Sequence, residues 1–228
     1  KGQKMALLAP SGLPLHEYLT RLIRSVPVFV VFAAIGLNEK DAYYYKDIFQ
    51  KSGDFSDGVM VLSKASASAA ERLSTPRVAL TVGEYFAFSK GLDVLVVMTD
   101  MLAYAEAWKE FNAESGIRHD DFAAAPLRND LAGLYERAGC LAGRSGSLSL
   151  LAVMPDSENG VPHPVTELSA SLLEGQVVLS RSFNVDVLAS RSHRIATRAG
   201  RGRTFGAHRF LAEQLYASYA KSCSVYRR

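Results

Sequence analysis

The sequence predicts an α/β fold in which a mostly parallel β-sheet is flanked by helices. Apolar runs of strand length alternate with longer segments of helical period along the 228 residues. The longest of these runs, Pro27–Ile35, carries no polar residue, as in a strand that is covered on both faces. Apolar residues make up 48% of the chain, which is sufficient for one substantial core. Alternating strands and helices of this kind favour a parallel sheet between two layers of helices.

The strands are predicted from apolar runs that are rich in β-branched residues or bounded by turn residues. In chain order they are Met5–Leu8, Pro27–Ile35, Gly58–Ser63, Asp93–Thr99, Leu148–Met154 and Gln176–Leu179. The runs PVFVVFAAI and DVLVVMT indicate fully buried strands. A loop rich in Pro, His and Ser, Pro155–Thr166, is expected after the fifth strand.

Helices are predicted between the strands from capping residues, helical period and stop signals. Asn38 is expected to cap a helix that ends at Lys51. Ala67–Lys90 is expected to break at Pro76, because proline disrupts a helix interior but fits a first turn. The other predicted helices are one after the Pro/Ser/Gly turn that follows Leu8, and those at about Asp100–Asn112, Leu127–Ala138 and 206–221.

Basic residues are concentrated near the end of the chain. Residues 181–228 contain ten Lys or Arg and two acidic residues, whereas the remainder contains sixteen basic and twenty-one acidic residues. A basic region favours an anionic partner, and it is equally compatible with a solvated surface. Two cysteines are too few for a disulfide framework, the five histidines lack metal-ligand spacing, and no apolar run reaches the roughly 18 residues of a membrane span. We therefore expect a cytoplasmic protein without a metal site.

Residues 9–14 lie where a nucleotide-binding protein carries its phosphate loop. They follow a strand and precede a helix, a setting in which backbone N–H groups and a helix N-terminus cradle phosphates. A working loop ends in Gly-Lys-Ser/Thr, whose lysine reaches the phosphates and whose hydroxyl holds Mg²⁺. The residues here are Ala9, Pro10, Ser11, Gly12, Leu13 and Pro14. This phosphate loop is therefore predicted to be degenerate, and the alternative is an ordinary strand-to-helix turn.

Longer motifs along nearly the whole chain resemble one family and occur in its order. They are KGQKMALLAPSGLP, VFAAIGLNEKDA, TPRVALTVGEYFAF, LDVLVVMTDMLAYAEA, DLAGLYERAG, GSLSLLAVMP, HPVTELSASLLEGQVVLSR and EQLYASYA. They resemble the central nucleotide-binding domain of the B-type subunit (the beta chain) of V/A-type rotary ATPases, the non-catalytic partner of the catalytic A-type subunit. The resemblance implies a RecA-like, P-loop-type fold. It also implies that residues 1–228 are a single central domain, without the family's N-terminal β-barrel and C-terminal helical domain.

By this resemblance, three components of a catalytic site are missing. Leu13 and Pro14 replace the lysine and the metal-binding hydroxyl of the catalytic relatives. Their water-activating glutamate corresponds to Leu37, which cannot accept a proton. Asp100 occupies the Walker-B-like position of the acid that supports Mg²⁺, but without the hydroxyl we expect it to cap the following helix. The chain is therefore not expected to hydrolyse ATP by itself.

The resemblance also implies an arginine finger, which the non-catalytic chain of this family delivers to the ATP of the neighbouring catalytic chain. The family pattern Val-Leu-Pro-Ser-Leu-Ser-Arg aligns with residues 187–193 and places His193 at the finger position. Imidazole is largely neutral near pH 7 and lacks the planar fork of arginine. Arg194 and then Arg191 are therefore the preferred candidates. The alternative is that both are ordinary surface arginines.

A shortened loop after Arg181 makes nucleotide binding doubtful. Family members carry a Tyr-Pro-Pro turn there, near the adenine pocket, and only residues 182–186 remain in this chain. Phe183 either substitutes in part for the lost aromatic residue or, as we expect, packs in the core. ATP or ADP is thus the only cofactor to consider, at a degenerate interface site.

The favoured function is a non-catalytic, regulatory B-type subunit. It would alternate with catalytic A-type subunits in a hexameric ring, contact central-stalk subunits and couple ATP hydrolysis or synthesis to proton or sodium transport. It would reach the membrane only through the complex, as part of the peripheral head. The alternative is a diverged structural paralogue that neither binds nucleotide nor supplies an arginine finger. An active secretion motor conflicts with the missing lysine and glutamate, and the Arg191–Arg203 cluster is not expected to bind nucleic acid.

Overall fold

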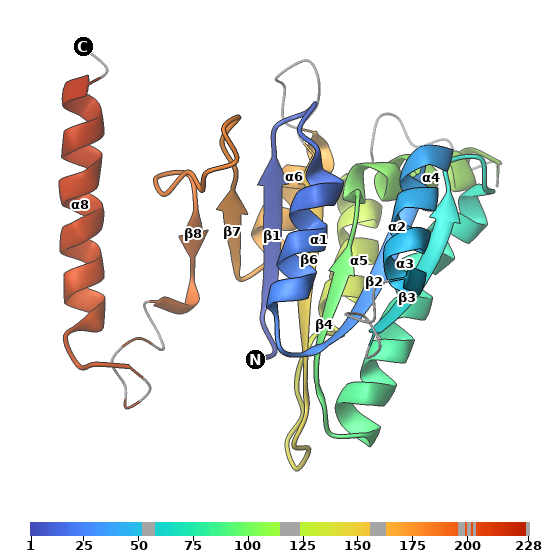
Figure 1. Cartoon of the computed structure of the whole chain (residues 1–228), viewed down its shortest axis with the longest axis horizontal. Helices are drawn as coiled ribbons and strands as arrows, with labels where there is room; N and C mark the ends of the chain where they lie inside the picture. The colour runs from blue at the N-terminus through green and yellow to red at the C-terminus, as the bar shows by residue number, and fades with distance from the viewer. Residues whose placement is uncertain are drawn as a thin grey trace.

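The computed structural model describes residues 1–51, 58–114, 124–155, 163–195, 199, 202 and 204–226. Its strands are β1 (Lys4–Ala9), β2 (Phe29–Leu37), β3 (Gly58–Lys64), β4 (Asp93–Met98), β5 (Gly139–Cys140), β6 (Ser147–Pro155), β7 (Gly175–Val178) and β8 (Arg191–Ser192). Within the described residues they form one sheet in the order β3-β2-β4-β6-β1-β7-β8, with β5 paired to β6 off this path (Figure 1). The strands from β3 to β7 in this order are parallel, whereas β5 and β8 are antiparallel to their neighbours. The predicted, mostly parallel sheet is confirmed.

Helices cover both faces of the sheet. The helices are α1 (Leu15–Ser25), α2 (Glu39–Lys51), α3 (Ala69–Glu84), α4 (Met101–Glu114), α5 (Ala124–Tyr135), α6 (Pro164–Leu172) and α8 (His208–Tyr226). One hydrophobic core lies under α1 and α2, and a second core lies under α3, α4, α5 and α6. Helix α8 stands beyond β8, apart from the helices that cover the sheet (Figure 1). In the part of the chain that the structure describes, no helix has both the length and the apolar character that a membrane crossing demands.

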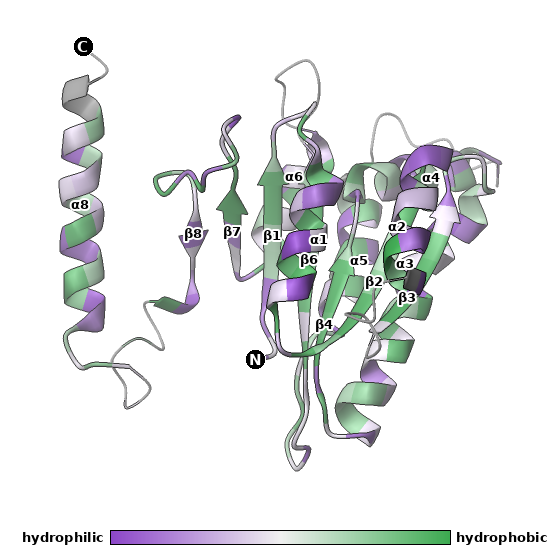
Figure 2. Ribbon diagram, viewed as in Figure 1, coloured by the Kyte–Doolittle hydropathy of each residue, from purple (hydrophilic) through white to green (hydrophobic). Residues whose placement is uncertain are grey.

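The central strands contribute to both cores. On β2, Val31, Ala33 and Ile35 face the core under α3 and α4, whereas the intervening residues face the core under α1 and α2. The hydropathy of β2 and β4 is accordingly high along most of their length (Figure 2). Burial on two sides is the physical reason why these strands read as uninterrupted apolar runs.

The predicted strands are all confirmed to within two residues at each end. The cap of α2 is also confirmed, because the Asn38 Oδ1 accepts a hydrogen bond from the Asp41 N–H at 2.8 Å. The loop predicted over Pro155–Thr166 is wrong at its end, since α6 begins at Pro164. Pro164 fits the first turn of a helix, and the His163 Nδ1 accepts a hydrogen bond from the Val165 N–H at 3.3 Å. Residues 156–162 of this predicted loop lie outside the described residues.

The predicted break at Pro76 is wrong. Helix α3 runs through Pro76 and continues into a π-helical turn, η2 (Tyr85–Ser89). A proline in a helix interior costs ~3 kcal/mol or more. Pro76 is buried in the same helix as Leu73 and Leu80, and this packing against the sheet offsets the lost backbone hydrogen bond. Helix α5 also begins earlier than predicted, at Ala124, and α8 ends later, at Tyr226.

Candidate functional site

The candidate site lies at the edge of the sheet where the carboxyl ends of the parallel strands meet. The degenerate phosphate loop follows β1, Asp100 follows β4, and Leu37 ends β2. In sheets of this type, ligands bind outside the carboxyl ends of the strands. A small cavity of about 170 Å³ lies there and is lined by Leu13, Leu15, His16, Leu19, Leu37, Asp41, Tyr45, Thr99, Asp100, Val153 and Pro155. The fold therefore brings the predicted loop, Leu37 and Asp100 to one place.

The predicted phosphate loop, residues 9–14, forms a turn between β1 and α1. Ala9 is buried at the end of β1, whereas Ser11, Gly12 and Pro14 are exposed and Gly12 adopts φ +79°. The Leu15 N–H, at the start of α1, already donates to the Leu13 carbonyl at 2.7 Å. The side chains of Leu13 and Pro14 have no group that could bind a phosphate or a metal ion.

The start of α1 is also electrostatically unsuited to phosphate. The Glu17 N–H donates to the Pro14 carbonyl at 3.1 Å, so this amide too has an internal partner. The Glu17 carboxylate lies in the first turn, where its negative charge interacts favourably with the positive end of the helix dipole. The negative charge of Glu17 therefore repels an anion from the start of α1, which is where a phosphate loop would bind a phosphate group.

Asp100 caps the next helix. Its Oδ1 accepts a hydrogen bond from the Ala103 N–H at 3.0 Å, and its backbone adopts φ +47°. Burial raises the pKa of this carboxyl, hydrogen bonds from backbone N–H groups oppose the rise, and the nearby charge of Glu106 adds to it. The capping role expected from the sequence is thus present in the structure.

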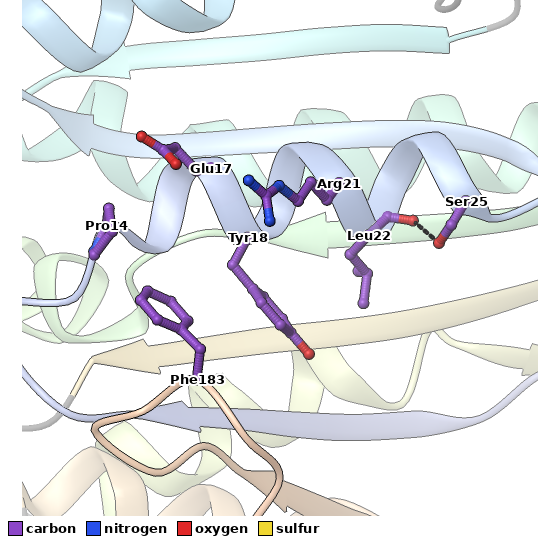
Figure 3. A pocket seen from close by; sticks show the side chains of 7 residues that line it. All are labelled: Pro14, Glu17, Tyr18, Arg21, Leu22, Ser25 and Phe183. Carbon is purple, nitrogen blue, oxygen red and sulfur yellow. Dashed lines mark hydrogen bonds between the residues drawn. The ribbon is translucent and has the colours of Figure 1, made fainter.

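Phe183 lies in the wall of a second, larger cavity, beside α1. This cavity of about 550 Å³ is lined by Pro14, Glu17, Tyr18, Arg21, Leu22, Ser25 and Phe183 (Figure 3). Phe183 is half-buried at a tight turn, with φ +61°, and its ring stacks on Tyr18 with centroids 6.2 Å apart and an interplanar angle of 21°. The expectation that Phe183 packs in the core is therefore wrong. The sequence carried no signal that would pair it with Tyr18.

The arginine candidates lie on the edge strand β8 and just after it. Arg191 and His193 are exposed, whereas Arg194 is half-buried. The Arg194 Nη2 donates to the Gly2 carbonyl at 3.2 Å and forms an ion pair with the Glu174 carboxylate. Arg198, Arg201 and Arg203, which belong to the same basic cluster, lie outside the described residues.

The ion pair with Glu174 engages Arg194 in a contact within its own chain. The second oxygen of this carboxylate, Oε2, accepts a hydrogen bond from the Lys4 N–H at 3.2 Å. Burial alone would raise the pKa of Glu174, but the hydrogen bonds from Arg194 and the Lys4 N–H hold that pKa below its usual value. Arg194 thus fastens the start of β1 to the loop before β7. On this geometry Arg191 is a stronger candidate than Arg194, the reverse of the order that the sequence suggested.

No metal centre accompanies these residues. Across the described ranges, no group of three or more His, Cys, Asp or Glu side chains could hold a metal ion. Cys140 and Cys223 are both free thiols.

Comparisons with known proteins agree on one family. The family model for the ATP synthase alpha/beta family, nucleotide-binding domain, matches residues 1–192. A V-type ATP synthase beta chain from Thermotoga neapolitana is 37% identical over 239 aligned residues, which cover 99% of this chain and 52% of that protein. The chain therefore spans about half the length of this curated relative.

Two solved structures share the fold. One is described as a unique ATP synthase subunit, NeqB, from Nanoarcheaum equitans; it is 33% identical with a TM-score of 0.86, covering 100% of this chain and 58% of that one. The other is described as a prototypical ATPase from the type III secretion system of pathogenic bacteria; it is 25% identical with a TM-score of 0.76, covering 86% of this chain and 58% of that one. These similarities confirm the predicted P-loop-type α/β fold.

Proposed function

Because this chain belongs to the ATP synthase alpha/beta family, we propose that it is the central domain of a non-catalytic B-type subunit of a V/A-type rotary ATPase. In this role it alternates with catalytic A-type subunits in a hexameric ring and contacts the central stalk. It helps to couple ATP hydrolysis or synthesis to proton or sodium transport, and it reaches the membrane only through other subunits. Its similarity to a V-type ATP synthase beta chain supports this assignment.

The observation that carries the non-catalytic part of the proposal is the cavity at the degenerate loop. Small-molecule sites usually enclose about 300–1,000 Å³. The cavity between Leu13, Leu37 and Asp100 encloses about 170 Å³, and most of its lining is apolar. A leucine stands in place of the phosphate-binding lysine and another in place of the water-activating carboxylate. These features support a site that does not hydrolyse ATP by itself.

The functional contribution that we propose is Arg191, acting on a neighbouring subunit. Arg191 is exposed on the last strand of the sheet, beyond β7, while its own degenerate loop follows β1. An arginine that stabilises the transferring phosphoryl group in trans is worth about 10³- to 10⁵-fold in rate in related enzymes. The exposed His193 lies two residues away and lacks the planar fork that grips phosphate oxygens.

The test is Arg191→Ala in a ring reconstituted with catalytic A-type subunits. We expect kcat for ATP hydrolysis to fall by about 10³-fold, because charge on the transferring phosphoryl group loses its counter-charge. The amount of ring, measured by native mass spectrometry, should not change. Arg209→Ala is the matched control, since Arg209 is exposed and its ion pair with Glu213 joins two turns of α8.

Two outcomes would contradict the proposal. ATP turnover by the purified chain alone would show that the chain is catalytic. Unchanged turnover of the Arg191→Ala ring would favour the second candidate function, a structural paralogue without an arginine finger. The ion pair that holds Arg194 inside the chain is the observation that keeps this second candidate open.

A further inference from the structure

We propose that Asp186 is the positioning residue for Arg191, because its carboxylate closes the turn that sets the register of β8. This inference rests on the proposed function of Arg191. The segment concerned is residues 186–190, here called the register turn, which leaves β7 and returns to it just before Arg191.

The register turn is an insertion in an antiparallel pair of strands. The Asp186 N–H donates to the Val178 carbonyl at 2.8 Å, and Arg191 is the register partner of Gln176. Residues 187–190 therefore stand opposite Val177 alone. With such an insertion, the shape of the extra segment decides which residue resumes the pairing.

Asp186 holds this shape through two backbone amides. Its Oδ1 accepts hydrogen bonds from the N–H groups of Leu188 and Ala189, each at 3.0 Å. Its own carbonyl accepts a hydrogen bond from the Ser190 N–H at 2.9 Å, which closes the turn. Hydrogen bonds to an ionised acceptor are about twice as strong as neutral ones, so the carboxylate is the principal local restraint.

The turn is also fastened to β7. The Ser190 Oγ accepts a hydrogen bond from the Val178 N–H at 2.9 Å, which replaces the ladder hydrogen bond that the insertion interrupts. The Gln176 Nε2 donates to the Ala189 carbonyl at 3.0 Å. The Tyr216 hydroxyl, from α8, donates to the Leu188 carbonyl at 2.9 Å. The segment before Arg191 is thus restrained at nearly every residue.

The register decides on which face of the sheet Arg191 lies. Register partners project to the same face, so Arg191 shares a face with Gln176, and Gln176 in turn shares a face with Ala6 on β1. Ala6 belongs to the core under α3 to α6, so Arg191 faces away from α1. A slip by one residue would turn the guanidinium to the opposite face. A small shift would also matter, since misplacing a catalytic group by about 1 Å lowers a rate by roughly 10²-fold.

The test compares Asp186→Ala with Asp186→Asn, whose amide oxygen still accepts hydrogen bonds. In the chain alone, we expect Asp186→Ala to accelerate amide hydrogen exchange at Leu188 and Ala189 by roughly tenfold or more, and Asp186→Asn to accelerate it less, because its neutral amide oxygen still accepts both hydrogen bonds. In the reconstituted ring, Asp186→Ala should lower kcat by roughly 10²-fold without changing assembly, and Asp186→Asn should restore most of the rate. The double variant with Arg191→Ala should be no slower than Arg191→Ala alone, since both act through one group.

The outcomes separate this inference from the proposed function. If Arg191→Ala slows the ring while Asp186→Ala does not, the inference is overturned and the proposed function stands. If Arg191→Ala has no effect, the proposed function falls, and with it the role of Asp186. Ser190→Ala is the second variant, for use if Asp186→Ala does not fold. It removes the hydrogen bond that Ser190 Oγ accepts from the Val178 N–H, and it should also lower kcat of the ring. Glu213→Ala, an exposed acid on α8, is the control and should leave kcat unchanged.

Discussion

At the carboxyl end of β4, Asp100 combines a positive φ with a capping hydrogen bond to the Ala103 N–H. Its carboxyl pKa is raised in the folded chain, chiefly by burial, relative to the usual value of about 3.9 in an unfolded chain. The folded state therefore binds this proton more tightly than the unfolded state does. It follows that the free energy of unfolding decreases as the pH rises from the unfolded pKa through the folded pKa.

Asp100→Asn tests this account at the level of one residue. Asn keeps the capping oxygen and tolerates a positive φ, but it removes the buried charge. We expect its free energy of unfolding at pH 7 to equal or exceed that of the wild type, and the advantage to vanish as the pH is lowered to the unfolded pKa. Urea denaturation across this pH range measures both quantities.

The matched variant is Asp100→Ala, which loses the cap and is strained at φ +47°. It should be less stable than Asp100→Asn by about 1–3 kcal/mol at pH 7. An advantage of Asp100→Asn that does not change with pH would contradict the assignment of a raised pKa to this carboxyl.

Among the helices, Arg137 joins the end of α5 to the end of α3. The Arg137 Nε and Nη2 donate to the two carboxylate oxygens of Glu84 at 2.6 and 2.7 Å. The Nη2 also donates to the Thr81 Oγ1 at 2.8 Å, and the Nη1 donates to the Arg77 carbonyl at 3.2 Å. Glu84 is the last residue of α3 before the π-helical turn η2. The Arg137 guanidinium therefore fixes the end of α5 to the point where α3 passes into the π-helical turn η2.

Arg137→Ala should weaken the packing of these two helices. We expect a loss of about 1–3 kcal/mol in the free energy of unfolding, because a bidentate, half-buried pair and two further hydrogen bonds disappear together. Arg209→Ala is the matched control, since its exposed pair with Glu213 should contribute less than about 0.5 kcal/mol. If urea denaturation gave the same loss in free energy of unfolding for both variants, the Arg137 guanidinium would have no special role in joining the two helices.

Over the whole molecule, buried contacts are distributed unevenly. Residues 30–35 of β2 are all buried, whereas most described residues of α8 are exposed, including Phe210 at 59% and Leu215 at 71%. Helix α8 stands beyond β8 (Figure 1), and the Tyr216 hydroxyl donates to the Leu188 carbonyl. An element with few buried apolar contacts opens at a lower free energy than the core does.

Native-state hydrogen exchange should therefore resolve two classes of amide in the isolated chain. We expect amides of β2 and β4 to exchange only through global unfolding, and those of α8 to exchange through local opening at much lower free energy. Tyr216→Phe should accelerate exchange in α8 and leave exchange in β2 unchanged. Equal protection of α8 and β2 would mean that α8 is more firmly attached than its exposure indicates.

Local sequence alone was sufficient to predict six of the strands, most of the helices between them and the capped start of α2, whereas α6, β5 and β8 were not predicted. These features depend on apolar runs for strands that are buried on two faces, and on the side chains of a few consecutive residues for a helix cap. The family motifs likewise consist of consecutive residues, so they could be recognised before any contact was known.

Features that depend on residues distant in sequence became evident only in the folded chain. Pro76 stays within a helix because the sheet beneath it supplies the packing, and Phe183 lies against a cavity because Tyr18 is its neighbour. Arg194 is tied to Glu174 whereas Arg191 is exposed, although the two arginines stand three positions apart in one segment. The type of a residue limits the interactions that its side chain can make, but the fold decides which partner lies close enough to make them. The fold thus ties Arg194 to Glu174 and leaves Arg191 exposed.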